Sequence, residues 1–149
     1  MRASPLSALV LAFALAALSV TWFARATEAT RSYKIIVHPS NSTTEVDRRF
    51  LEDAFLRKIT RWPNDIVIYP VDLTPNSPVR RKFSEEILHR SVEAVKVYWQ
   101  QRIFSGRDVP PPELDTDDDV VAYVLKHDGA VGYISENTDP DGAKVVEAK

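Results

Sequence analysis

The chain has 149 residues, no cysteine and a formal net charge of −2 at pH 7. This length suits one domain with a hydrophobic core. Because basic residues are not in excess, the composition does not indicate binding to nucleic acid or to an anionic membrane. The absence of cysteine excludes a disulfide framework, a thiolate metal site and a cysteine nucleophile.

The first 26 residues have the pattern of a signal peptide. Arg2 supplies a short positive region, residues 6–24 carry no charge, and Ala24-Arg25-Ala26 matches the small-x-small pattern of a cleavage site. We expect cleavage after Ala26 and a periplasmic domain over residues 27–149, an environment that suits a chain without cysteine. The uncharged run is also long enough to span a membrane, so an uncleaved inner-membrane anchor is the alternative.

The first half of the remaining chain predicts two strands around a helix. A β-branched run indicates a strand at residues 33–37. Ser42-Thr43-Thr44-Glu45 has the spacing of a capping box, and apolar residues at helical intervals extend this helix over about residues 44–57. The apolar run of residues 66–69 has no alternation, which is typical of a strand buried on both faces of a parallel sheet.

The second half predicts three helices and two strands. Ser77 as N-cap and Pro78 as first residue begin one helix, and Ser91 can cap another. A third helix covers about residues 117–127, after which Gly129 provides a left-handed stop. The order of elements predicts an α/β fold, which we expect to be a single three-layer lobe with a mostly parallel sheet. The last strands are expected at residues 130–134 and 145–146.

The second predicted helix places three cations at its positive end. Cations at a helix N-terminus are unfavourable by about 0.3–1 kcal/mol each. Arg81 can pair with Glu85 and Lys82 with Glu86, because each glutamate lies four residues further on. Arg80 has no such partner, so its charge requires another explanation.

Two explanations of Arg80 remain open. In the first, Ser77 Oγ, the amides of Val79 and Arg80, and the Arg80 guanidinium meet an oxyanion, which the planar guanidinium can grip through two oxygens. In the second, Ser77 is a plain N-cap, and Arg80 is solvated or paired with a distant carboxylate such as Asp72.

Five segments match a known pattern in the same order along the chain. They are Ile36-Val37-His38-Pro39-Ser40-Asn41, Phe55-Leu56-Arg57-Lys58-Ile59-Thr60-Arg61-Trp62 (compare IFLGKITNW), Ser77 with Arg80 and Phe83 (compare Ser-Gly-Thr-Arg…Phe), Trp99 with Phe104-Ser105-Gly106, and Gly129-Ala130-Val131-Gly132-Tyr133-Ile134 (compare PGAIGYV). Together they resemble one lobe of a type 2 periplasmic solute-binding protein of the phosphate-binding kind. The resemblance implies a binding protein and not an enzyme.

Several departures from this family pattern bear on the ligand site. Members of the family have two lobes hinged around the ligand, and the resemblance covers one lobe. Arg57 replaces the glycine of the FLGK motif, and Pro78, which has no N–H, replaces the glycine that follows the serine. Asp72-Leu73-Thr74-Pro75-Asn76 contains no match for the Arg and Asp that precede this serine. We therefore expect a reduced phosphate cradle.

Ser40, Asn41 and Ser42 form a second group of predicted ligand-binding residues. They follow the first predicted strand, and ligands of open α/β sheets gather beyond the carboxyl ends of strands. A turn that leads into a capping box is the alternative for the same three residues.

The sequence predicts no catalytic residue, metal or cofactor. Four aspartates between residues 115 and 119 lack EF-hand spacing and suit a helix N-terminus. The three histidines show no paired metal spacing, and the chain has no nucleophile elbow or Gly-rich phosphate loop. A hydrolase would require Ser77 within hydrogen-bond reach of His38 or His89.

The resemblance implies an exported substrate-binding-like protein that recognises phosphate or a related oxyanion and is associated with ABC-type uptake or sensing. Capture of the ligand from both sides by a single lobe would require another chain or a homodimer. The alternative is a ligand-free interaction module that docks onto a membrane transporter or sensor. An exposed apolar patch opposite the Ser77 edge would favour that alternative.

Overall fold

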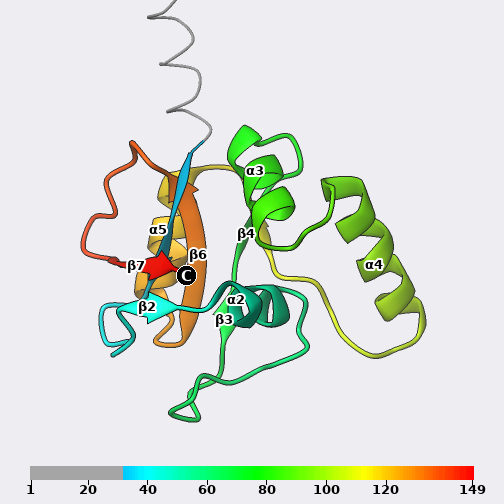
Figure 1. Ribbon diagram of the computed structural model, residues 1–149, viewed down its shortest axis with the longest axis horizontal. Helices are drawn as coiled ribbons and strands as arrows, with labels where there is room; N and C mark the ends of the chain where they lie inside the picture. The colour runs from blue at the N-terminus through cyan, green and yellow to red at the C-terminus, as the bar shows by residue number, and fades with distance from the viewer. Residues whose placement is uncertain (1–31) are drawn as a thin grey trace, which may run out of the picture.

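In the computed structural model, which describes residues 32–149, the chain forms an α/β lobe with helices packed around a central sheet (Figure 1). The predicted α/β class is confirmed. The predicted signal peptide at residues 1–26 lies outside the described residues. Within residues 32–149, no helix combines the length and the apolar character that crossing a membrane requires.

Seven strands form two sheets in the described part of the chain. They are β1 (Tyr33–Val37), β2 (Glu45–Val46), β3 (Tyr69–Pro70), β4 (Asp72–Leu73), β5 (Glu113–Leu114), β6 (Ala130–Ser135) and β7 (Lys144–Ala148). The main sheet has the order β2-β7-β1-β6-β3, and β4 pairs with β5 separately. β1 is antiparallel to β6 and β7, whereas the pairs β2/β7, β3/β6 and β4/β5 are parallel.

The sheet is mixed, and this corrects the prediction of a mostly parallel sheet. β6 and β7 run in the same direction on opposite sides of β1. Residues 136–143 connect them by returning along the length of β1, with Gly142 at a φ of 92° in the turn. β1 fills the place between these two parallel strands and runs the opposite way, so the longest pairings are antiparallel.

Four helices surround the sheet in the described residues. They are α2 (Arg48–Phe55), α3 (Pro78–Glu86), α4 (Val92–Phe104) and α5 (Asp117–Lys126). The predicted caps Ser77 and Ser91 are confirmed, since each Oγ accepts a hydrogen bond from the N–H three residues further on. The helix predicted at residues 117–127 is confirmed as α5, which Thr116 caps.

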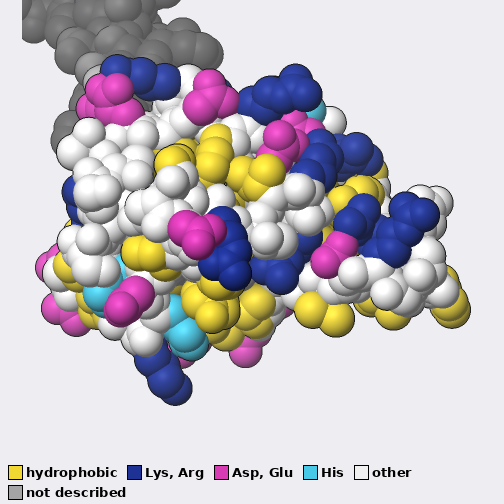
Figure 2. All heavy atoms as spheres, turned by 90° about the horizontal axis from the view of Figure 1, so that it is seen from below, with side chains coloured by type: hydrophobic (Ala, Val, Ile, Leu, Met, Phe, Trp, Pro, Cys, Tyr) yellow, Lys and Arg dark blue, Asp and Glu magenta, His cyan; other side chains and the backbone are white. Residues whose placement is uncertain are grey.

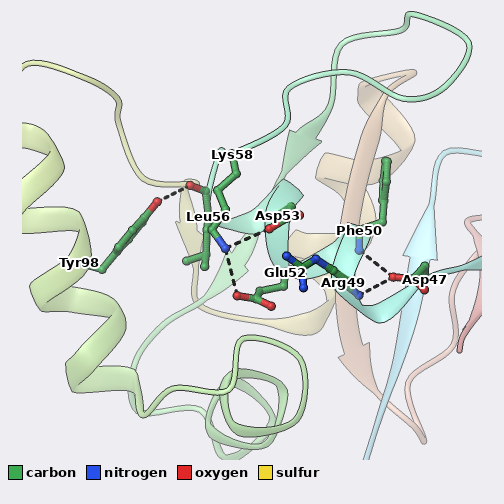
Figure 3. A network of polar contacts seen from close by, with 8 residues as sticks. All are labelled: Asp47, Arg49, Phe50, Glu52, Asp53, Leu56, Lys58 and Tyr98. Atoms are coloured by element: carbon green, nitrogen blue, oxygen red, sulfur yellow. Dashed lines mark hydrogen bonds and ion pairs between the residues drawn. The ribbon is translucent and has the colours of Figure 1, made fainter.

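α2 begins later than predicted. Residues 45–46 form β2 beside β7, so they are not part of a capping box. Asp47 caps the helix instead, and its Oδ1 accepts the N–H groups of Arg49 at 2.7 Å and Phe50 at 3.1 Å (Figure 3). Pairing with β7 satisfies backbone groups of residues 45–46, and the helix starts where this pairing stops.

α2 ends next to a residue with left-handed backbone. Arg57 has a φ of 57°, and it occupies the position where the family motif has glycine, which adopts this conformation without strain. Lys58 then turns back to two carboxylates of α2 at 3.2 and 3.0 Å (Figure 3). The Tyr98 hydroxyl of α4 donates to the Leu56 carbonyl at 2.8 Å, which joins α4 to the end of α2.

The strand predicted at residues 66–69 is only partly formed, since Tyr69 alone of these residues belongs to β3. Tyr69–Pro70 pairs with β6, while Val67 forms an isolated bridge with Arg61. Gly129 lies against this segment, because a Cβ at Gly129 would come within 1.8 Å of the Val67 carbonyl oxygen. Gly129 therefore permits close approach of two backbones, and the predicted left-handed helix end at this glycine is wrong since its φ is not positive.

The core lies between the sheet and the helices. Phe83 of α3 stacks on Tyr133 of β6 with ring centroids 3.8 Å apart, and Phe55 of α2 packs beside both rings. The described core and its strand pairings use residues from 33 to 148. Residues 32–149 therefore contain a hydrophobic core of their own.

Candidate functional site

The beginning of α3 is closed largely by its own residues. Ser77 Oγ accepts the Arg80 N–H at 3.3 Å, and Pro78 contributes no N–H. The Val79 N–H has no hydrogen-bond partner among residues 32–149. It is the backbone donor that this helix N-terminus leaves for an external anion.

The Arg80 side chain is buried instead of reaching solvent. Arg80 is 2% exposed, and it forms an ion pair with Asp72, which is also buried. Its Nη1 lies 3.5 Å from the Tyr133 hydroxyl, and its Nε has no hydrogen-bond partner in the described part. Pairing with Asp72, the second explanation of Arg80, is therefore observed.

Tyr133 completes this buried network. Its hydroxyl donates to the Asp72 carboxylate and accepts the Leu73 N–H at 3.2 Å. Burial raises the pKa of the Tyr133 phenol, which keeps it a neutral donor. Burial also lowers the pKa of the Arg80 guanidinium, against the opposing influence of nearby Tyr133 and Glu113, but arginine stays protonated. Arg80 and Asp72 thus neutralise each other.

Of the two ion pairs predicted along α3, one is formed and the other is not. Lys82 pairs with Glu86 at 2.8 Å, as the four-residue spacing predicts. Arg81 and Glu85 are both exposed, and neither takes part in an ion pair within the described range. Arg81 therefore offers its charge to solvent. Sequence spacing pointed to Arg80 instead, because spacing along a helix could not reveal that Asp72 lies beside it.

Ser40, Asn41 and Ser42 form a turn after β1. The Oγ of Ser40 lies 2.6 Å from His38 Nδ1, which also accepts the Ser40 N–H at 3.1 Å. Asn41 is buried, and its Oδ1 accepts the Thr43 N–H at 2.9 Å. The turn thus engages the side chains of Ser40 and Asn41, while Ser42 is exposed.

The two predicted groups of ligand-binding residues lie at opposite ends of the strands of the sheet. β1 is antiparallel to β6, and β3 is parallel to β6. The turn that follows β1 therefore lies at the end where β6 begins, whereas Ser77, which follows β3 and β4, lies towards the end of β6. Figure 1 shows this separation between the cyan loop beside β2 and helix α3. A single small anion cannot contact both groups.

Arg80 lines a groove beside the start of α3. The groove has a volume of about 640 Å³ and lies between α3, α4 and the proline-rich segment before β5. Val95 and Trp99 give it an apolar floor, and Arg80 lines one end. Lys96 and Glu93 lie at its rim, so its charge is mixed.

The described residues do not form the arrangement that would favour a hydrolase. Ser77 bonds only to backbone groups of its own turn among the described residues, and no hydrogen bond joins it to His38 or His89. Within residues 32–149, no cluster of His, Asp or Glu suits a metal ion. Asp117 of the acidic run accepts hydrogen bonds from residues 135–138, which ties that loop to α5.

Comparison with known proteins identifies the fold. No protein-family model matches the chain, and no curated protein matches it in sequence. Several solved structures match. One is a Clostridium perfringens protein described as a phosphate ABC transporter substrate-binding protein with bound phosphate (22% identity, TM-score 0.60, 78% of this chain and 44% of that one). Others are an ABC-type phosphate transport receptor from Vibrio cholerae (19%, 0.61, 80% and 48%) and PstS from Borrelia burgdorferi (12%, 0.59, 79% and 47%).

At these identities the likeness establishes the fold. The chain has the fold of part of a phosphate-type substrate-binding protein, and it spans less than half the length of each matched structure. The resemblance to one lobe of this family, predicted from five short segments, is confirmed at this level. The residues that bind ligand in this chain remain a prediction.

Proposed function

We propose that the chain is an exported substrate-binding-like protein that recognises phosphate or a related oxyanion and is associated with ABC-type uptake or sensing. The observation that carries this proposal is the fold. It is shared with a Clostridium perfringens protein that has phosphate bound and with a Vibrio cholerae receptor for ABC-type phosphate transport. These neighbours are binding proteins, which supports binding over catalysis as the role of the chain.

The start of α3 is the proposed contact surface. An oxyanion there would receive the Val79 N–H and the positive end of the helix dipole, with Ser77 Oγ beside it. Arg81 is exposed without an ion pair in the described part, so it can add a charge-assisted hydrogen bond. Asp72 cancels the charge of Arg80, so Arg80 does not attract the anion itself. Its pairing with Asp72 instead holds the first turn of α3 in place. One free amide and one exposed arginine imply weak binding.

Calorimetric titration of residues 27–149 with phosphate, with sulfate as the competing anion, tests this proposal. We expect saturable binding that Ser77→Ala and Arg81→Gln each weaken several-fold. Ser91→Ala is the matched control for the first variant, because it removes the same kind of cap from α4 at a similar loss of about 1 kcal/mol. Arg49→Gln is the control for the second, since Arg49 is exposed in the first turn of α2.

Two results would overturn the proposed site. One is the absence of heat with either anion up to millimolar concentration. The other is binding that the test variants and their controls weaken equally, which would place the anion elsewhere on the chain.

The buried pairing of Arg80 with Asp72 favours a second candidate, an interaction module that docks onto a membrane transporter or sensor. A cancelled charge contributes little to anion capture, and the apolar groove against α4 offers a surface for a protein segment. This candidate predicts a silent phosphate titration. It also predicts that Lys96, at the groove rim, is protected from amine-reactive labelling in intact cells, relative to exposed Lys126 on α5.

A further inference from the structure

The end of α4 and the loop after it expose large apolar side chains. Ile103 is 53% exposed, Phe104 91% and Val109 70%, and residues 103–109 are called the α4 tip below. α4 stands at one end of the molecule in Figure 1. In Figure 2, hydrophobic and basic side chains lie together at that same end. Exposed apolar groups that cluster with charged neighbours mark a site of association.

The α4 tip is a closed turn and not a frayed helix end. Gly106 has a φ of 65°, and its N–H donates to the Ile103 carbonyl in the last helical turn at 3.0 Å. The Arg107 N–H bonds to the Arg102 carbonyl at 3.1 Å, and the Arg102 guanidinium pairs with Asp108. The Tyr98 hydroxyl fixes α4 to the body of the protein (Figure 3). These bonds hold the apolar side chains outward.

Cations surround these apolar residues although the whole chain is acidic. Arg57, Arg107 and two apolar residues of the tip line a hollow of about 390 Å³. Arg107 is exposed and forms no ion pair within residues 32–149, and the buried Nε of Arg57 has no partner there. Asp108, the acidic residue of the hollow, is already engaged by Arg102. Arg57 Nη1 donates to the Ile68 carbonyl at 3.4 Å, so Arg107 supplies the free donors of the hollow, and Arg57 adds positive charge.

These features fit a lipid surface better than a protein. A protein partner would have to supply a fitted pocket for Phe104, whereas acyl chains accommodate a protruding ring without one. A second copy that met this one tip to tip would bring Arg57 and Arg107 close to their equivalents, which is unfavourable. An anionic bilayer supplies hydrocarbon for the apolar side chains and phosphate groups for the cations.

We propose that the α4 tip is a contact site for anionic membranes. Ile103, Phe104 and Val109 enter the boundary of the hydrocarbon, and Arg57 and Arg107 hold a lipid phosphate in the hollow beside them. The contact is shallow and reversible because three side chains bury little area. It does not involve the start of α3, so it stands or falls independently of the proposed anion site.

Co-sedimentation of residues 27–149, which include the described core, with phospholipid vesicles tests this proposal. We expect binding to vesicles that contain phosphatidylglycerol and phosphatidylcholine in equal parts, and much weaker binding to phosphatidylcholine alone. Phe104→Ser should reduce binding at least about tenfold, because the variant loses the free energy gained when a phenylalanine ring leaves water. Arg107→Glu should reduce binding to the anionic vesicles about tenfold and leave binding to neutral vesicles nearly unchanged.

Val145→Ser is the matched control, because Val145 is 45% exposed on β7, outside the tip. This control should bind like the parent chain, and all variants should keep the parent's thermal unfolding since the substituted side chains are exposed. Three outcomes would overturn the proposal: no binding to anionic vesicles, binding that neither tip variant weakens, or a tip-dependent dimer in ultracentrifugation that accounts for the sedimentation.

Discussion

The beginning of α3 and the end of α4 treat their charged residues in opposite ways. At α3, Arg80 turns inward to a buried carboxylate, and its hydrogen bonds are made within the protein. At α4, Arg107 remains in solvent while Phe104 is pushed outward. The two neighbouring helices thus differ in one respect: the arginine at the start of α3 is buried and paired with Asp72, whereas the arginine after α4 is exposed and forms no ion pair within residues 32–149.

This difference teaches that the place of a cation in a sequence does not decide whether it is available to a ligand. Arg80 lies at the helix start that resembles an anion site, yet Asp72 has already cancelled its charge. Arg107 lies in the loop after α4, yet its side chain is exposed and forms no ion pair within the described residues. Burial and the identity of spatial neighbours make this distinction.

The largest expected effect is that of Asp72→Asn. It leaves the Arg80 charge buried without its counter-ion, which should lower the free energy of unfolding by about 3–5 kcal/mol, measured in urea. The control Asp65→Asn removes a pair with Arg61 at the surface and should cost less than about 1 kcal/mol. The double variant Asp72→Leu with Arg80→Met should recover most of the stability. Equal losses for Asp72→Asn and the control would contradict a buried pair.

Tyr133→Phe should destabilise by about 1–3 kcal/mol, because it removes one hydrogen bond from the Asp72 carboxylate, which keeps its pairing with Arg80, and leaves the Leu73 N–H without a buried partner. Thermal unfolding followed by circular dichroism measures this loss. Tyr98→Phe is the control, since it removes a single hydrogen bond that is partly exposed. If Tyr133→Phe proved the milder of the two, the hydroxyl would not be part of the α3 network.

Arg57→Gly should raise stability by about 1 kcal/mol, since glycine removes the strain of the left-handed backbone. The same change should weaken vesicle binding, because it removes one cation from the hollow at the α4 tip. Arg57→Ala separates the two effects: it deletes the side chain but keeps the strain. If Arg57→Gly lowered both the stability and the vesicle binding, the backbone of Arg57 would not be strained as proposed.

Glu86→Gln should have the smallest effect. Partial burial pushes the pKa of Glu86 upward, but hydrogen bonds from Lys82 and Tyr33 outweigh it and hold this pKa below 4.5, the ordinary value. The resulting stability is present above pH 4.5 and is lost as the pH falls through the lower folded pKa. Urea titrations from pH 6 to pH 3 should therefore show a slightly shallower acid decline in the variant, by less than about 1 kcal/mol because the pair is exposed. An unchanged decline would exclude this contribution.

Local patterns in the sequence determined the parts of the fold that depend on near neighbours. The caps Ser77 and Ser91, the first strand, the last helix and the pairing of Lys82 with Glu86 all follow from residues within one or two turns of each other. Five ordered motifs also identified the lobe, since motif order survives where overall identity is low.

Tertiary structure decided everything that depends on which segments meet. The antiparallel place of β1 put the turn at Ser40 and the helix start at Ser77 at opposite ends of the strands of the sheet, which no local pattern could indicate. β2 formed where a capping box was expected, because β7 lies beside it. The net charge of the chain did not indicate the cations at the α4 tip, because a net charge does not show where individual charges lie in the folded protein. Burial and proximity set the energy of a charge, and both are properties of the folded chain.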